Sequence, residues 1–254
     1  MNPLTHKSRT FTVIAVVAMV LPLNWCCKKG PLCNCFVPAG PTKEETRTVP
    51  FFNQVDVNDN INVLLSTGPQ EQVLVQGGKH LIKYIAAQVS SGVLILKNNN
   101  RCNWMRSYEK SHINVYITMP NFTYITNEGV GDIKSMDTLV ADSFQVQTKS
   151  AGNVNLLVRS KYINTHLFGS GDLTLAGTTS TFTCAFYSGT GFLYCENLIT
   201  SGYAFIASST TGDCYISSNG ILDVTIYKNG NVYYSGKPQE IWYKHYGKGQ
   251  LIPN

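Results

Sequence analysis

The chain has 254 residues, of which 43% are hydrophobic and only 14% charged, and its formal net charge is +5. Six of its 20 basic residues precede residue 48, against two acidic ones, so the remainder carries 14 basic and 13 acidic residues and is nearly neutral. This balance, without a Lys/Arg block in the body, argues against nucleic-acid recognition. The length suits one elongated domain with a substantial core.

The first residues have the features of an export signal. Lys7 and Arg9 precede an uncharged apolar run at 11–23, which is too short to span a bilayer of about 30 Å as a helix. Such a basic start followed by a short apolar core is typical of a signal peptide. We therefore assign residues 1–27 to a signal that directs the chain to the cell envelope.

The end of that run resembles a bacterial lipobox, in which a leucine three residues before a cysteine directs lipid attachment. It reads Leu23-Asn24-Trp25-Cys26-Cys27. Trp25 departs from the small residue usual before the lipidated cysteine, so Cys26 and Cys27 are both candidates for a lipid anchor in the membrane. Simple secretion after cleavage near residues 37–39 and a retained membrane anchor are the alternatives.

Residues 28–47 are rich in Pro, Gly and Lys, which predicts a solvated tether before a domain at 48–254. Cys33 and Cys35 lie within it. Because no nearby Cys or His completes a four-ligand set, a disulfide or free thiols are favoured over a metal site.

Strand-like apolar runs follow at 61–65, 73–75, 93–96 and 113–118. They repeat less clearly than the rest of the chain. Either irregular first coils of a larger repeat or a capping sheet would account for them.

From Gly131 onward a glycine recurs about every twenty residues, a period that belongs to solenoids. The column glycines are Gly131, Gly152, Gly171, Gly191, Gly212, Gly230 and Gly249. We expect them at turns whose backbone angles a side chain would forbid. The residue after each glycine is Asp, Asn or Gln in six of seven cases, the exception being Phe192. Asn and Asp are favoured in turns.

Two apolar columns accompany the glycines. The second residue after each glycine is Ile133, Val154, Leu173, Leu193, Cys214, Val232 or Leu251. The fourth residue is Ser135, Leu156, Leu175, Cys195, Ile216, Tyr234 or Pro253, a column that is mostly apolar except at its first and last members. A further alternating run precedes each glycine, as in Phe182-Thr183-Cys184. Alternation marks strands with one buried face, so each coil supplies at least two strands. The pattern predicts an all-β parallel β-helix with rungs of about 20 residues, and a β-sandwich or antiparallel barrel is the runner-up.

An active site is not indicated by the sequence. Asp172 and Asp213 share an outward column, but Phe192 lies on the rung between them, and a turn role is favoured over an inverting glycosidase pair. The five histidines show no metal-ligand spacing. Cys195 and Cys214 replace apolar residues of the two columns and are interpreted as small buried hydrophobes. We expect no catalytic residues, no metal and no cofactor.

Three consecutive coils place Tyr194, Tyr215 and Tyr233 at one outward position. Together with Trp242 and Tyr246 near the same end, they form a candidate aromatic platform for a glycan or a protein partner. Cross-rung stacking that stabilises the sheet is the alternative, and we favour it.

The segment from about residue 48 to the end resembles the head GIN domain family, also called DUF2807 or auto-transporter adhesins, found mainly in Bacteroidetes. Residues 51–57 followed by 60–63 resemble its opening strand pair, with Asn60-Ile61-Asn62 in place of the family's Gly-Ile-Asn. Residues 129–133 and 169–173 resemble its Gly-x-Gly-Asp-Leu units. The resemblance implies a right-handed β-helix, export to the envelope, frequent lipid anchoring and adhesion, without catalytic residues.

The sequence thus predicts a noncatalytic, lipid-anchored envelope protein that presents a β-helix surface for binding or adhesion. A β-helix enzyme acting on polysaccharides and a purely structural envelope component are the alternatives.

Overall fold

The computed structural model describes residues 38–101 and 112–254. The predicted signal and the first half of the tether, residues 28–37, lie outside these ranges, with Cys26, Cys27, Cys33 and Cys35. Apart from the 3-10 turn η3 at Ile82–Tyr84, the regular structure of the described part is β. The strands are β1 Thr42–Arg47, β2 Gln54–Val57, β3 Ile61–Thr67, β4 Gln72–Gly78, β5 Ile85–Ser90, β6 Val93–Asn98, β7 Ile113–Met119, β8 Tyr124–Asn127, β9 Ile133–Thr148, β10 Val154–Leu167, β11 Leu173–Phe186, β12 Leu193–Ser208, β13 Cys214–Ser218, β14 Ile221–Ile226, β15 Val232–Ser235, β16 Glu240–His245 and β17 Leu251–Pro253.

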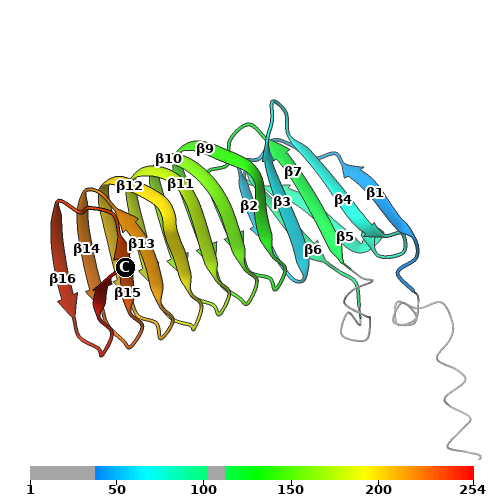
Figure 1. Cartoon of the computed structure of the whole chain (residues 1–254). Helices are drawn as coiled ribbons and strands as arrows, with labels where there is room; N and C mark the ends of the chain where they lie inside the picture. Colours follow the sequence, from blue (N-terminus) through cyan, green and yellow to red (C-terminus); the bar gives the residue numbers. More distant parts are fainter. Residues whose placement is uncertain (1–37, 102–111) are drawn as a thin grey trace, which may run out of the picture. The chain divides into compact units, whose positions relative to one another are not determined.

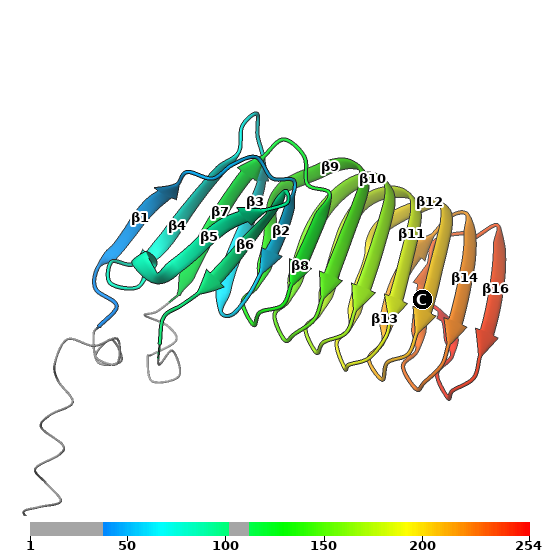
Figure 2. The ribbon, with the colours of Figure 1, turned by 180° about the vertical axis from the view of Figure 1, so that it is seen from behind.

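From Ile133 onward each coil contributes to two stacks of parallel strands (Figures 1 and 2). Stack A contains the first halves of β9 to β12, followed by β13, β15 and β17. Stack B contains the second halves of β9 to β12, followed by β14 and β16. Because successive coils pair in parallel, the predicted β-solenoid is confirmed, and the antiparallel sandwich or barrel is wrong.

The core lies between the inward faces of the two stacks. Leu156 and Leu175 of stack A and Phe182 and Ile206 of stack B are at most 1% exposed. Both apolar columns predicted from the repeat are therefore confirmed as buried. Alternating outward residues are half-buried or exposed, as expected for strands with one solvated face.

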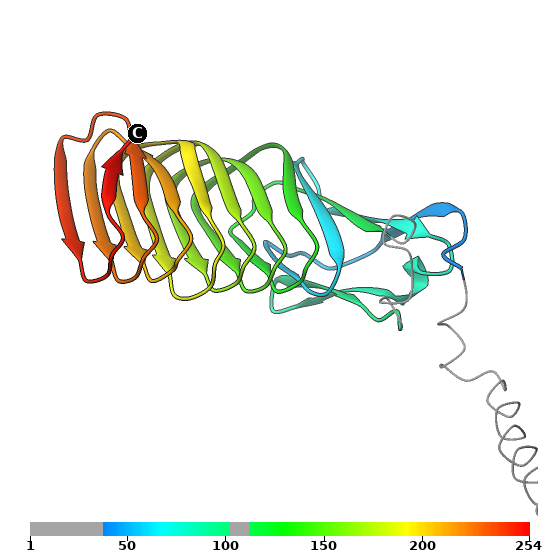
Figure 3. The same cartoon turned by 60° about the horizontal axis from the view of Figure 1, so that its bottom comes forward.

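The column glycines are required for a different reason from the predicted one. None of the seven has a positive φ. Instead, a Cβ on Gly171 would lie 2.2 Å from the carbonyl oxygen of Gly152, and one on Gly212 would lie 2.1 Å from that of Gly191. The turns of successive coils, which form a row in Figure 3, approach so closely that no side chain fits between them.

Residues 54–127 add irregular coils to the same two stacks. In stack A, β3 lies between β7 and β9, and in stack B, β2 lies between β6 and β8; all four pairings are parallel. The coil formed by β2 and β3 is thus inserted between coils that come later in the sequence. The strands predicted at 61–65, 73–75, 93–96 and 113–118 are confirmed as β3, β4, β6 and β7.

Antiparallel strands cover the outer edges of these first coils. In stack A, β4 pairs with β7, and β1 pairs with β4; in stack B, β5 pairs with β6 through a two-residue turn at Ser91 and Gly92. The first part of the domain therefore contains both structures that the sequence left as alternatives: irregular coils and antiparallel strands that cap them. The prediction of a tether to residue 47 is wrong for Thr42–Arg47, because backbone pairing with β4 does not require an apolar side chain.

Candidate functional site

A row of Asn and Asp side chains connects successive coils on the outer surface of stack A. We call it the Asx ladder; it contains Asn62, Asp132, Asn153, Asp172, Asp213 and Asn231. Each side-chain Oδ1 accepts a hydrogen bond from a backbone N–H of the next coil, at 2.8 to 3.1 Å. The ladder therefore supplies acceptors for backbone donors at every turn but one.

The Asx ladder includes Asp172 and Asp213, the two carboxylates considered above as a catalytic pair. Asp172 accepts from the backbone N–H of Phe192, and Asp213 from that of Asn231. Phe192 has no side-chain oxygen, so it interrupts the ladder between them. The turn role predicted for this column is confirmed by these contacts.

Beside the ladder, Tyr194, Tyr215 and Tyr233 form one column of stacked rings, which we call the tyrosine column. The ring centroids lie 5.5 Å apart for Tyr194 and Tyr215 and 4.9 Å apart for Tyr215 and Tyr233, with interplanar angles of 11° and 9°. Phe192 extends the stack, 6.0 Å from Tyr194. The cross-rung stacking favoured from sequence is therefore present. Because neighbouring rings cover one another's faces, the column presents ring edges and hydroxyl groups to solvent.

The hydroxyls of Tyr194 and Tyr215 stay protonated at neutral pH. Burial raises the pKa of Tyr194, with Asp172 as the next contributor, and burial followed by Asp213 raises the pKa of Tyr215. At Tyr233 the hydroxyl accepts a hydrogen bond from Asn231 Nδ2 at 3.3 Å. The column is thus a row of phenol groups that can donate and accept hydrogen bonds.

Trp242 and Tyr246 do not join the tyrosine column. Trp242 lies on β16, which pairs with β14 of stack B, and its ring meets that of Tyr203 edge-on at 6.4 Å. Tyr246 follows β16 and stacks on Tyr227 at 5.4 Å. The predicted aromatic set is therefore divided between the two stacks.

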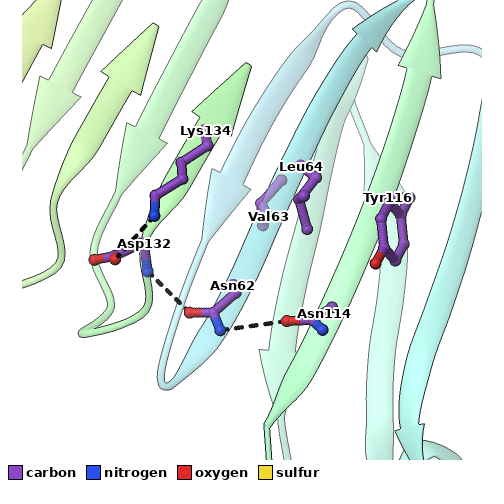
Figure 4. A pocket seen from close by; sticks show the side chains of 7 residues that line it. All are labelled: Asn62, Val63, Leu64, Asn114, Tyr116, Asp132 and Lys134. Atoms are coloured by element: carbon purple, nitrogen blue, oxygen red, sulfur yellow. Dashed lines mark hydrogen bonds and ion pairs between the residues drawn. The ribbon is translucent and has the colours of Figure 1, made fainter. Parts of the chain in front are cut away.

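A hollow of about 200 Å³ lies on the outer surface of stack A, among the first coils (Figure 4). Its lining residues are Asn62, Val63, Leu64, Asn114, Tyr116, Asp132 and Lys134. Asn62 Nδ2 donates to Asn114 Oδ1 at 3.3 Å, and Lys134 Nζ lies 3.9 Å from Asp132 Oδ2. Gln76 joins the group because its Oε1 accepts from Asn114 and from the Tyr116 hydroxyl.

This hollow and the tyrosine column belong to one outward row. Register places Tyr116 beside Leu64 and Leu64 beside Lys134. The row continues through Asn155 and Thr174 to the tyrosine column. Sequence reasoning missed the hollow, although Ile-Asn-Val occurs at both 61–63 and 113–115 and was a signal that two strands share a position.

The repeat cysteines are core residues. Cys184, Cys195 and Cys214 are free and buried. Burial raises the pKa of the Cys184 thiol to about 12 and also raises those of Cys195 and Cys214, so all three remain thiols at neutral pH. Within residues 38–101 and 112–254, no group of three or more His, Cys, Asp or Glu side chains is arranged to hold a metal ion.

The sequence of this chain matches a known protein family. The model described as "Putative auto-transporter adhesin, head GIN domain" matches residues 51–238. The chain belongs to the head GIN domain family. No curated protein sequence matches it. In the described ranges of this head GIN protein, no helix has the length and apolar character needed to cross a membrane.

Solved structures share the fold. A putative adhesin from Bacteroides fragilis is 21% identical with a TM-score of 0.77, over 85% of this chain and 99% of that one. A putative adhesin from Parabacteroides distasonis is 15% identical with a TM-score of 0.63, over 85% and 98%. A putative lipid binding protein from the same organism is also 15% identical, with a TM-score of 0.62 over 85% and 98%. At these identities the likeness concerns the fold alone.

Proposed function

We propose that this head GIN domain is a noncatalytic adhesin of the cell envelope that binds a neutral glycan along the outer surface of stack A. The tyrosine column is the observation that carries this proposal: three phenol groups, stacked at one-coil intervals, lie in one row with the amide of Asn155 and the hydroxyl of Thr174. Equivalent strands of successive coils lie about 4.8 Å apart. A linear polymer along the solenoid axis meets a hydrogen-bonding group at each coil from Lys134 to Tyr233.

The chemistry of the row favours a neutral sugar polymer over an anionic one. Residues from 48 onward carry 14 basic and 13 acidic side chains, so long-range attraction of a charged polymer is weak. Asp172 and Asp213 lie beside the row and would repel an anion. Phenol, amide and hydroxyl groups are suited to the hydroxyls of sugars, and the hollow at Asn62 and Asn114 offers a further polar contact.

Support for a noncatalytic role comes from the same surface. Asp172 and Asp213 lie in one outward column, separated by Phe192. Each accepts a hydrogen bond from a backbone N–H of the next coil, at 2.9 and 2.8 Å. A general acid must be free to protonate a leaving group, whereas these groups hold neighbouring coils together.

The test is a glycan array probed with the full chain in detergent solution. Changing Tyr194, Tyr215 and Tyr233 together to Phe keeps the ring stack but removes three hydroxyls, and should weaken binding about 100-fold if each hydrogen bond contributes about 1 kcal/mol. The matched control is Tyr227→Phe with Tyr246→Phe, a stacked pair on stack B, which should bind like the parent. Absence of binding by the folded parent contradicts the proposal for the glycans on the array.

We propose further that the protein is exported and anchored by a lipid on Cys26 or Cys27. Support comes from the apolar run at 11–23 and the leucine at position 23. Mass spectrometry of the chain expressed in a Bacteroidetes host should find an acylated N-terminal cysteine. Cys26→Ser and Cys27→Ser, made separately, identify the modified residue, because only one of them should abolish acylation. Unmodified chain from all three preparations would contradict the anchor.

A further inference from the structure

The last coil leaves one strand edge of stack B unpaired. β16 pairs with β14, and no strand in the described ranges pairs with its other edge. Its inward residues Ile241 and Tyr243 are 41% and 39% exposed, whereas their partners in the preceding coil, Leu222 and Val224, are 0% exposed. The apolar core therefore ends at an uncovered strand (Figure 1).

The backbone of β16 is oriented to accept another strand. Tyr246 N–H donates to the Ile226 carbonyl of stack B at 2.7 Å. Backbone N–H and C=O groups of successive strand residues point to opposite sides of the strand. Because Tyr246 faces β14, Trp242 and Lys244 face β14 as well, and Ile241 and Tyr243 face the free edge. Unpaired N–H and C=O groups of this kind are a template for pairing with another chain.

The neighbouring edge in stack A is less suited to pairing. β17 has three residues, and its last, Pro253, has no N–H to donate. In the preceding coil the N–H of the inward residue Val232 points toward the next coil and donates to the Gln250 carbonyl. The N–H groups of inward residues of β17 would therefore point toward the free edge. Pro253 is at an inward position, so the free edge of stack A lacks a donor there.

The sequence of β16 is complementary to itself in one antiparallel register. With Trp242 at the centre, Ile241 lies opposite Tyr243 and Glu240 lies opposite Lys244. The apolar inward residues then face one another, and each outward carboxylate faces an ammonium group. Centring the pair on Ile241 or on Tyr243 loses the match between Glu240 and Lys244.

Trp242 adds a further contact in this register. Its side chain is outward and 46% exposed, and it lies opposite Trp242 of the second copy. Because the edge-facing backbone groups belong to Ile241 and Tyr243, the Trp242 pair is not hydrogen-bonded, and in such pairs the side chains are closest. Aromatic cross-strand pairs stabilise antiparallel strands.

We propose that two copies of the protein associate through their β16 edges, antiparallel, about a two-fold axis at Trp242. A two-fold axis perpendicular to the sheet keeps inward residues inward, so stack B becomes one continuous sheet and the two core ends cover each other. The contact is isologous and closes at two copies, which leaves no further β16 edge for growth. It does not depend on the glycan surface, which lies on stack A.

Sedimentation of the full chain in detergent solution with reductant tests the dimer. Lys244→Glu puts two like-charged pairs in the interface and should weaken dimerisation about tenfold, and Glu240→Lys should do the same. The double variant Glu240→Lys with Lys244→Glu restores opposite charges and should return to within about threefold of the parent. Lys161→Glu, exposed on β10 where the chain passes from stack A to stack B, is the control and should dimerise like the parent.

A parent that remains monomeric at about 100 µM, near the weak end of specific association, overturns the proposal. Dimerisation that Lys244→Glu leaves unchanged also overturns it, because the contact then lies elsewhere. Weakening by both single variants with no recovery in the double variant rejects the register centred on Trp242.

Discussion

The regular coils from Ile133 onward and the first coils before Asn127 form the same two stacks by different routes. The regular coils pair in sequence order and only in parallel. The first coils place β3 between β7 and β9, and they use antiparallel strands at their outer edges. A coil thus requires compatible inward columns and a shared register, and it does not require its strands to be consecutive.

The two regions also differ in how they end. β1, β4 and β5 cover the first coils with antiparallel pairs, whereas β16 and β17 end the regular coils without such a cover in the described ranges. Solenoids need terminal units that protect their core and their strand edges. The proposed dimer at β16 would give the second end the protection that the first end already has.

The largest effect that separates the two regions is expected at their glycines. Gly212→Ala in the regular coils places a Cβ 2.1 Å from the Gly191 carbonyl oxygen, and we expect it to lower the free energy of unfolding by about 3 kcal/mol, since successive turns must move apart. Chemical unfolding followed by circular dichroism measures this change.

A glycine of the first coils is the control. Gly92 has φ +79° in the turn between β5 and β6, and a Cβ there would lie 3.8 Å from Asn53 Oδ1, the nearest atom. Because Asn tolerates left-handed backbone, Gly92→Asn should cost less than about 1 kcal/mol. A loss at Gly92→Asn equal to that at Gly212→Ala would contradict the distinction between close approach and backbone angle.

A smaller effect is expected in the Asx ladder, which crosses from one region into the other. Asp213→Ala leaves the half-buried N–H of Asn231 without its acceptor and should cost about 1 kcal/mol, whereas Asp213→Asn keeps Oδ1 and should cost little. Asn62→Ala, at the junction with the first coils, should cost at least as much as Asp213→Ala, because the backbone N–H of Asp132 loses its acceptor and Asn114 Oδ1 loses a donor. Equal stability of Asp213→Ala and Asp213→Asn would show that the ladder contributes nothing.

Much of the regular region could be predicted from sequence because its contacts repeat. Leu175 and Phe182 were assigned to buried columns by alternation alone, and the structure confirms both. The reason for the glycines could not be predicted, since close approach and unusual backbone angles both select glycine. The insertion of β3 between β7 and β9 was also hidden, because it depends on contacts between segments far apart in the chain.

The candidate site was predictable only where neighbouring coils repeat one residue type. Tyr194, Tyr215 and Tyr233 were found by their common position. Phe192 was noticed only as an exception to a polar column, although it stacks on Tyr194. Trp242 was grouped with the tyrosines because it is near in sequence, but the change from stack A to stack B within each coil separates them.

Hydroxyl-radical footprinting of the full chain, with and without a glycan captured on the array, tests the location of the binding surface most directly. We predict that oxidation of Tyr194, Tyr215 and Tyr233 falls on binding, while that of Tyr227 and Tyr246 is unchanged. Protection of Tyr227 and Tyr246 with no change in the tyrosine column would contradict the account and place the adhesive surface on stack B.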